Sequence, residues 1–174
     1  MKPRYGGRYR PPAPKRSNLI TAAGAKQLRQ ELDYLWRKKR PQVTQAVKEA
    51  AALGDRSENA EYIYGKKQLR EIDSRVRFLQ KRLELVKVVD SLPTEQDKIF
   101  FGAWVKLLDE LDQKRNLRIV GPDEIDPSLG YISIDSPLAK ALIGKQVDDQ
   151  VVLQDLHKTY DILAIWYQEE TCNT

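Results

Sequence analysis

The sequence predicts an α+β protein in which an antiparallel helical hairpin precedes a small, mostly antiparallel β domain with one short helix. Two observations favour the hairpin. Apolar residues recur in steps of three and four along residues 21–53 and again along 58–90, and only residues 54–57 separate the two stretches. A third observation favours the β domain, because beyond residue 99 the apolar period falls to two and β-forming residues become frequent.

Charge divides the 174-residue chain into a basic and an acidic half. The formal net charge is +5, yet residues 1–18 and 19–90 each carry +6, whereas residues 91–174 carry −7. Residues 1–17 are rich in proline and basic side chains and poor in aliphatic ones, so we expect a disordered tail. This tail is either simply solvated or in nonspecific contact with nucleic acid. A polyanion would meet the basic half, and a protein surface suits the acidic half.

The first predicted helix runs from about Thr21 to Leu53, within a coiled-coil domain at residues 18–90. Its apolar residues recur near the helical period of 3.6. Pro41 interrupts this pattern and should kink the helix or open it locally, because proline has no N–H to donate. The expected apolar face consists of Leu28, Leu32, Leu35, Trp36, Val43, Ala46, Val47 and Ala50.

The second predicted helix, from Glu58 to about Asp90, has the stronger signal, since its apolar residues form a heptad seam over more than three heptads. A short connection between two long helices forces an antiparallel hairpin whose seams pack together. At about 1.5 Å per residue each helix would be near 50 Å long, so the tip at residues 54–59 lies far from the rest of the chain. The seam consists of Tyr62, Gly65, Leu69, Ile72, Val76, Leu79, Leu83 and Val86.

The tip carries two carboxylates, Asp55 and Glu58, three residues apart at the start of the second helix. Two interpretations are open on spacing alone. In the structural one, Gly54 ends the first helix, Asp55 caps the second and Glu58 completes a capping box. In the functional one, both carboxylates point off the tip and hold a divalent cation. Mg²⁺ is typically bound by one or two carboxylates together with waters and substrate phosphates.

Seven basic side chains follow the tip along the second helix. Lys66, Lys67 and Arg70 lie within five residues of one another, close to Tyr62 and Tyr64. They form either a solvated flank of the coiled coil or a track that leads a phosphate backbone to the carboxylates. The full set is Lys66, Lys67, Arg70, Arg75, Arg77, Lys81 and Arg82.

The polar residues 91–98 predict a linker, and residues 99–170 predict the small β domain. Pro137 should open a short helix over residues 138–143, which Gly144 ends. The pattern shows no catalytic constellation in this half of the chain. Strands are predicted at residues 100–108, 117–120, 131–134, 150–154 and 160–167.

Cysteine and histidine usage excludes several kinds of site. Cys172 is the only cysteine, which rules out an intrachain disulfide and a thiolate cluster. His157 is the only histidine, which rules out a site of several imidazoles. The longest apolar runs fall far short of the roughly 20 residues that a transmembrane helix needs, and no secretory signal opens the chain. We therefore expect a cytoplasmic monomer without membrane contact.

Five segments carry a family resemblance. They are GDRSENAEY at 54–62, LWR at 35–37 with RP at 40–41, LREID at 69–73, FGAWV at 101–105 and YISIDSPLAKAL at 131–142. Together they resemble the bacterial Gre transcript-cleavage factors, and their details are more similar to the GreB branch than to GreA. The match runs in order from about residue 18 to residue 168.

The resemblance implies a fold, a partner and a site. Family members join an N-terminal antiparallel coiled coil to a C-terminal FKBP-like domain, which docks at the rim of the RNA polymerase secondary channel. The coiled coil enters the channel. Its acidic tip, here Asp55 and Glu58, helps the polymerase active site to hold a second Mg²⁺ and to orient the attacking water. The polymerase then cleaves the extruded 3′ end of its nascent RNA and resumes elongation.

Further roles are carried over by position. The basic residues behind the tip would contact the extruded RNA, and one segment of the β domain would dock on the polymerase. The first set is Lys66, Lys67 and Arg70, and the second is Asp135, Ser136 and Pro137.

Three functions compete. The leading one is a cofactor, not itself an enzyme, that stimulates the cleavage activity of RNA polymerase. The second is an inhibitor with the same fold that occupies the secondary channel, against which the intact Asp55 and Glu58 argue. The third is a peptidyl-prolyl isomerase or chaperone, and it rests on the FKBP-like domain alone, which does not establish an activity.

Overall fold

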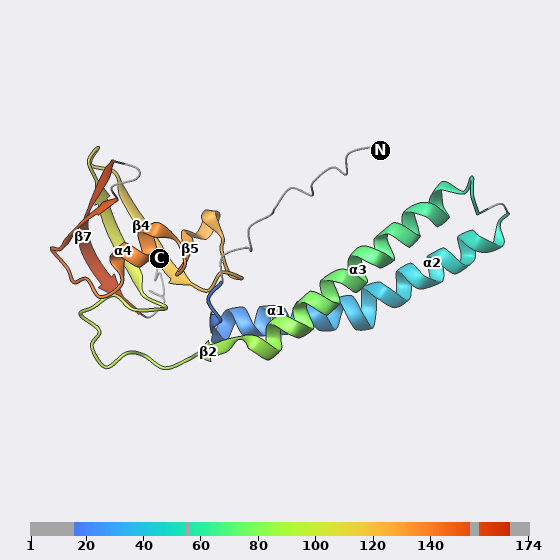
Figure 1. Ribbon diagram of the computed structural model, residues 1–174, viewed down its shortest axis with the longest axis horizontal. Helices are drawn as coiled ribbons and strands as arrows, with labels where there is room; N and C mark the ends of the chain where they lie inside the picture. Colours follow the sequence, from blue (N-terminus) through green and yellow to red (C-terminus); the bar gives the residue numbers. More distant parts are fainter. Residues whose placement is uncertain (1–15, 55, 154–156, 168–174) are drawn as a thin grey trace, which may run out of the picture.

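The computed structural model describes residues 16–54, 56–153 and 157–167. It shows a long helical rod beside a small β domain (Figure 1), as the sequence predicts. The proposed tail at 1–17 lies outside the described residues except for Arg16 and Ser17. Within these described ranges, no helix is both long and apolar enough to span a bilayer.

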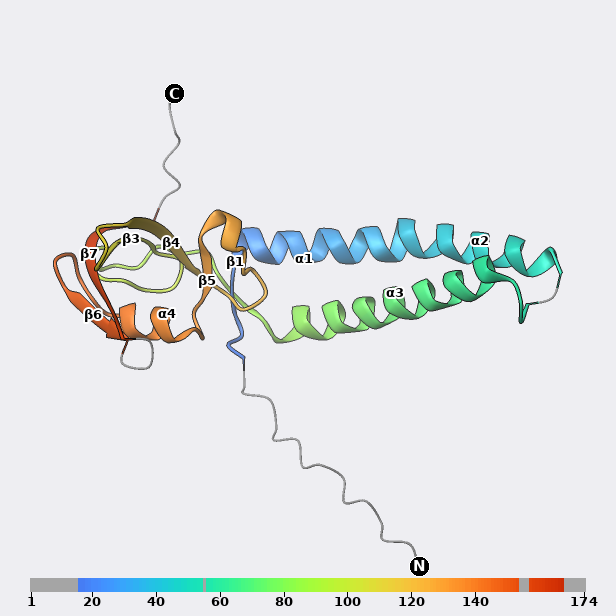
Figure 2. The ribbon, with the colours of Figure 1, turned by 90° about the horizontal axis from the view of Figure 1, so that it is seen from above.

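The rod is the predicted antiparallel hairpin. Its first arm consists of α1 (Ala22–Tyr34), a π-helical stretch η1 (Leu35–Lys39) and α2 (Arg40–Ala52), and its second arm is α3 (Ala60–Leu85). Figure 2 shows the two arms side by side along the rod. The second arm is shorter at both ends than the expected helix over 58–90.

The hairpin core follows the predicted seam of the second helix. Ile72 and Val76 pack with Val43 of α2, and Leu79 packs with Leu28 of α1. Nearer the tip, Gly65 lets the helices approach closely, because a Cβ at this position would lie 2.4 Å from a methyl carbon of Val47.

Two residues of the expected apolar face of the first arm are exposed, namely Trp36 and Ala46. Leu35 already packs in the hairpin core. Successive helical residues point about 100° apart, so Trp36 cannot face the same seam. The prediction for these two side chains was wrong.

Pro41 opens the helix locally, as expected. The N–H of Arg40, the residue before it, donates to the carbonyl of Leu35, five residues earlier, instead of the usual four. This π-type bond belongs to η1. The helix continues without a break into α2, so Pro41, which has no N–H, cannot donate to a carbonyl of the preceding turn.

A short parallel sheet closes the base of the rod, where the sequence predicted a continued helix to about Asp90. Here β1 (Leu19–Thr21) pairs with β2 (Lys87–Val89), with Ile20 opposite Val88. The valines of this segment are stiff at χ1 and therefore favour a strand. The segment forms one because β1, far away in sequence, pairs with it.

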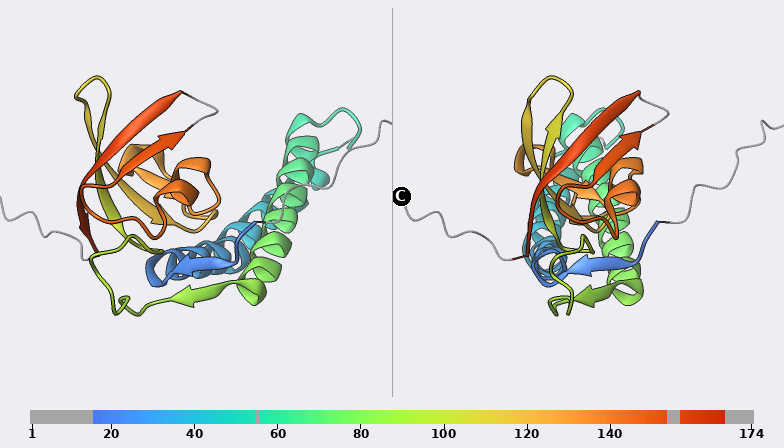
Figure 3. Two further views of the ribbon diagram at one scale, coloured as in Figure 1. Left: turned by 60° about the vertical axis from the view of Figure 1, so that its left-hand side comes forward. Right: turned by 90° about the vertical axis from the view of Figure 1, so that its left-hand side faces the viewer.

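The C-terminal domain is a five-stranded sheet with the order β5-β4-β3-β7-β6. Figure 3 shows this sheet curled, and α4 (Pro137–Leu142) packs on it through Ala139 and Leu142. Three pairings are antiparallel, but β4 and β5 are parallel. The strands are β3 (Trp104–Asp109), β4 (Lys114–Val120), β5 (Tyr131–Ser133), β6 (Gln150–Leu153) and β7 (Lys158–Trp166).

Two details of this domain differ from the prediction. Residues 100–103 form a turn instead of the start of the first strand, and Gly102 has a φ of +87°, which suits glycine. The parallel pairing follows from the connection between β4 and β5, which contains the 3₁₀ helix η2 (Pro127–Leu129) and is too long for a tight hairpin.

A buried polar cluster, which we call the junction, joins the rod to the β domain. The Nε of Arg82 in α3 lies 2.6 Å from a carboxylate oxygen of Asp123, and Arg82 also donates to Asn18 and to the carbonyl of Ser17. On the other arm, the backbone N–H and the hydroxyl of Thr21 both donate to Glu124. These contacts set the direction in which the rod leaves the β domain.

Candidate functional site at the hairpin tip

The cap of α3 is Asn59, not Asp55. Its side-chain oxygen accepts a hydrogen bond of 3.0 Å from the N–H of Tyr62, and its amide nitrogen donates one of 2.9 Å to the carbonyl of Ala50. One side chain therefore joins the start of α3 to the end of α2. The sequence signal was present, since asparagine is among the best N-cap residues. The capping-box interpretation of Glu58 is wrong, because the helix begins only at Ala60.

The first arm ends as expected. Leu53 is the C-cap of α2, and Gly54 follows it with a φ of +136°, a conformation that side chains with a Cβ rarely adopt. The chain then leaves the helix axis and turns towards Asn59. Asp55 lies outside the described residues, so its predicted role stays a prediction.

Glu58 is exposed in this turn, and no hydrogen bond or ion pair joins it to another described residue. In the part of the chain that is described, no group of three histidine, cysteine, aspartate or glutamate side chains could hold a metal ion together. A metal ion at Glu58 would therefore need ligands from outside the described residues. Exposed carboxylate oxygens are ligands that Mg²⁺ prefers, with the remaining ligands coming from water or a partner.

The structure divides the seven basic residues of α3 into two groups. Arg75 donates to both carboxylate oxygens of Glu31 at 2.7 and 2.8 Å, and this hydrogen bonding raises the pKa of the Arg75 guanidinium. Arg82 belongs to the junction. Among the described residues, the other five make no ion pair with a carboxylate, and we call them the outer cations: Lys66, Lys67, Arg70, Arg77 and Lys81.

The outer cations lie along one side of the rod. Lys66, Arg70, Arg77 and Lys81 are spaced by four, seven and four residues, which places them in one row on a helix. The Nε of Arg70 donates to the carbonyl of Lys66 at 3.3 Å, which holds its guanidinium along the helix surface. This row begins about two turns behind the tip, so a polyanion bound along it would lead to Glu58.

The three predicted docking residues have local partners in the β domain. Asp135 accepts a 2.8 Å hydrogen bond from the N–H of Ser17. Ser136 caps α4 by accepting from the N–H of Ala139 at 3.2 Å, and Pro137 occupies the first turn. These contacts give the segment a rigid shape. Their docking role stays a prediction.

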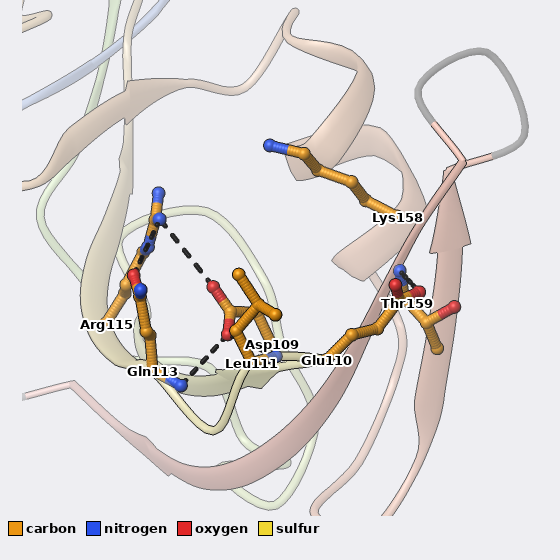
Figure 4. A pocket seen from close by; sticks show the side chains of 7 residues that line it. All are labelled: Asp109, Glu110, Leu111, Gln113, Arg115, Lys158 and Thr159. Atoms are coloured by element: carbon orange, nitrogen blue, oxygen red, sulfur yellow. Dashed lines mark hydrogen bonds and ion pairs between the residues drawn. The ribbon is translucent and has the colours of Figure 1, made fainter.

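A pocket of about 260 Å³ lies at the opposite end of the molecule, in the β domain (Figure 4). Its polar groups largely satisfy one another. Asp109 accepts from the N–H groups of Leu111 and Gln113 and lies 3.6 Å from Arg115, and Glu110 accepts from the N–H of Thr159. The tip, where Glu58 has no such partner among the residues that the structure describes, is the stronger candidate for a functional site.

Fold and site together define a class of protein: an elongated factor that presents an acidic tip and a basic flank at the end of a rod, held by a separate β domain. Comparison with known proteins agrees. A model described as "Transcription elongation factor, N-terminal" matches residues 18–88, and one described as "Transcription elongation factor, GreA/GreB, C-term" matches residues 93–167. The chain belongs to the GreA/GreB family of transcription elongation factors.

Similar proteins carry the GreB name. The chain is 62% identical to "Transcription elongation factor GreB" of Yersinia pestis over 155 residues, which cover 88% of this chain and 91% of that protein. It is 63% identical to the protein of the same name from Pseudomonas aeruginosa, with coverages of 84% and 88%. A solved structure, GreA factor homolog 1 (Gfh1) of Thermus thermophilus, aligns with 87% of this chain and 99% of its own at 25% identity and a TM-score of 0.41. The family and branch inferred from the sequence motifs are confirmed.

Proposed function

We propose that this protein enters the secondary channel of RNA polymerase and stimulates Mg²⁺-dependent cleavage of the extruded RNA 3′ end in backtracked complexes, after which elongation resumes. This proposal rests on the exposure of the tip carboxylate and on the residue that caps α3. Glu58 is exposed and unpaired among the described residues, while Asn59 performs the capping that the carboxylates could otherwise have performed. Membership of the elongation-factor family and the GreB name of similar proteins support it.

The shape of the rod suits this task. At about 1.5 Å per residue, the 26 residues of α3 extend the tip about 40 Å away from the base of the rod. The β domain would then stay at the channel entrance, where Asp135, Ser136 and Pro137 would contact the polymerase. The buried junction would keep the rod aimed into the channel while the domain stays docked.

The tip carboxylates would complete a metal site that the polymerase begins. Asp55 and Glu58 would supply oxygen ligands to Mg²⁺, and the polymerase active site would supply the rest. A second metal in such a site stabilises the attacking and leaving oxygens of an in-line displacement. Because the protein holds only part of the site, it would be a cofactor of the polymerase and not a nuclease by itself.

The outer cations would hold the extruded RNA along the rod. Lys66, Lys67 and Arg70 lie closest to the tip and would neutralise its first phosphates. Each neutralised phosphate releases counterions, so the stimulation should weaken as the salt concentration rises. The scissile bond would thereby be kept near the carboxylates.

Transcript cleavage by a stalled, backtracked RNA polymerase tests the proposal, with Mg²⁺ present and with or without this protein. We expect stimulation by the unaltered chain and a loss of about 100-fold or more in Asp55→Asn and Glu58→Gln, since each change removes a charged ligand. Glu61→Gln is the matched control, because Glu61 is an exposed carboxylate in the first turn of α3. It should keep nearly full activity.

Two other results would overturn the proposal. Normal cleavage by both tip variants would remove the carboxylates from the mechanism. Slower elongation without any cleavage by the unaltered protein would make it a channel-occupying inhibitor, the competing function. Circular dichroism of each variant would show that a lost activity is not a lost fold.

A further inference from the structure

Trp36 is a large aromatic side chain that the hairpin core does not use. It lies in the π-helical stretch η1, and 52% of its surface is exposed. Leaving this much apolar surface in water forgoes the stabilisation that burial would provide. π-Helical turns within α-helices are frequently found at functional sites. A half-exposed tryptophan in such a turn is therefore a candidate ligand-binding residue.

A chain of contacts places Trp36 on the same flank of the rod as the outer cations. The guanidinium of Arg40 lies 5.3 Å from the centre of the Trp36 ring, and its Nε donates to Asp73 of α3 at 2.7 Å. The carbonyl of Asp73 in turn accepts from the Nε of Arg77, an outer cation, at 3.1 Å. The ring thus borders the row of positive charges.

The position along the rod is also defined by these contacts. Asp73 is thirteen residues beyond the first residue of α3, and at about 1.5 Å per residue this is about 20 Å behind the start of the helix. A polyanion that follows the outer cations from the tip would pass Lys66 and Arg70 before it reaches Trp36. Only an extended ligand spans this distance.

The combination identifies the ligand by its chemistry. Proteins that bind single-stranded nucleic acid without sequence preference join a positively charged groove to aromatic rings on which bases stack. The flank provides both, since the Trp36 ring contacts Arg40, and Arg77 and Lys81, one turn apart in the row of outer cations, make no ion pair with a described carboxylate. Lys39, three residues after Trp36 on the same side of the helix, adds a further positive charge in η1.

We propose that Trp36 is a base-stacking platform for the distal part of a long extruded RNA, one helical turn beyond the level of Asp73 and so about 25 Å behind the start of α3. The inference rests on the proposed function, which brings RNA to the tip. Trp36 is a positioning residue, because it never reaches the scissile bond. Short extruded RNAs end before it, and long ones gain a stacking contact that resists their sliding along the rod.

The test compares Trp36→Ala and Trp36→Phe in backtracked polymerase complexes that extrude about three or about twelve nucleotides, a range around the usual size of single-strand sites. With limiting Trp36→Ala, we expect the polymerase to cleave the long RNA about five- to tenfold more slowly than with the unaltered protein and the short RNA at the normal rate. Trp36→Phe keeps a ring and should lose less.

Phe78→Ala is the matched control. Phe78 is 41% exposed and also has a guanidinium over its ring, that of Arg75 at 5.2 Å. Arg75 and Asp73 are two residues apart and bridge to the first arm on opposite flanks of α3. Removal of this aromatic ring should leave both RNA lengths unaffected.

A second readout does not depend on cleavage. 5-Iodouridine in the distal part of the extruded RNA should photocross-link to Trp36 in the long complex and not in Trp36→Ala. Equal losses at both RNA lengths, with weaker competition for the polymerase, would overturn the inference and assign Trp36 to a protein contact. Unchanged cleavage of long RNA without a cross-link would also overturn it. Failure of the unaltered protein on the short RNA would instead reject the proposed function itself, because that arm does not involve Trp36.

Discussion

The tip and the junction both contain carboxylates and basic side chains. At the junction these groups are buried and paired, whereas at the tip they are exposed. At the junction, Arg82 and Asp123 have side chains that are only 10% and 7% exposed, and they bind each other. At the tip, Glu58 is exposed, and neither it nor the nearby Lys66 has an ion-pair partner among the described residues. Between the two, the Arg75–Glu31 and Arg40–Asp73 pairs are partly exposed.

The difference shows that the burial of a charged side chain indicates its role. A buried charge must be paired, because removing it from water without a partner costs several kcal/mol. An exposed charge has no such need and remains available to a ligand. The charges of the junction therefore act on the stability and direction of the rod, whereas those of the tip act on a partner.

The largest effect on stability is expected for Arg82→Ala, which tests the junction side of this comparison. It leaves Asp123 buried without its partner, and removal of one member of a buried pair costs about 3–5 kcal/mol. The free energy of unfolding from urea titration would measure this cost. Replacement of both Arg82 and Asp123 by leucine should cost less than the single change, since no unpaired charge remains. A loss below about 1 kcal/mol in Arg82→Ala would show that the junction is not a structural ion pair.

A smaller effect is expected at the base of the tip. Asn59→Ala removes the N-cap of α3 and should cost about 1 kcal/mol. Hydrogen exchange at the N–H of Tyr62 should become faster. Asn59→Asp is the informative control, since aspartate still accepts from Tyr62 but cannot donate to the carbonyl of Ala50. If Asn59→Ala left exchange unchanged while Glu58→Gln accelerated it, Glu58 would be the cap after all.

The smallest effect is expected in the middle of the rod. Arg75→Ala removes an ion pair whose side chains are 45% and 37% exposed, and such pairs contribute at most about 1 kcal/mol. The free energy of unfolding should fall by less than this amount, and the difference should shrink further in high salt. A cost equal to that of Arg82→Ala would mean that exposure does not separate the two pairs.

Local periodicity determined much of this protein from its sequence alone. The heptad seam from Tyr62 to Val86, the hairpin, the place of the tip after Gly54, the local opening at Pro41 and the approximate strands all depend on near neighbours in the chain. The motifs around Asp55 and Glu58 also identified the family, since they are long and lie in order. The chemistry of these two carboxylates remains a prediction, and that of Asp55 lies outside the described residues.

Only the tertiary structure decided which charges are paired. Arg82 and Arg75 look alike in the sequence, and both find a carboxylate far along the chain, yet Asp123 is buried and Glu31 is partly exposed. The pairing of β1 with β2, the bond from Asn59 to Ala50 and the exposure of Trp36 likewise depend on segments that meet only after folding. The physical reason is that burial and pairing belong to the three-dimensional neighbourhood, whereas residue type and period are local to the chain.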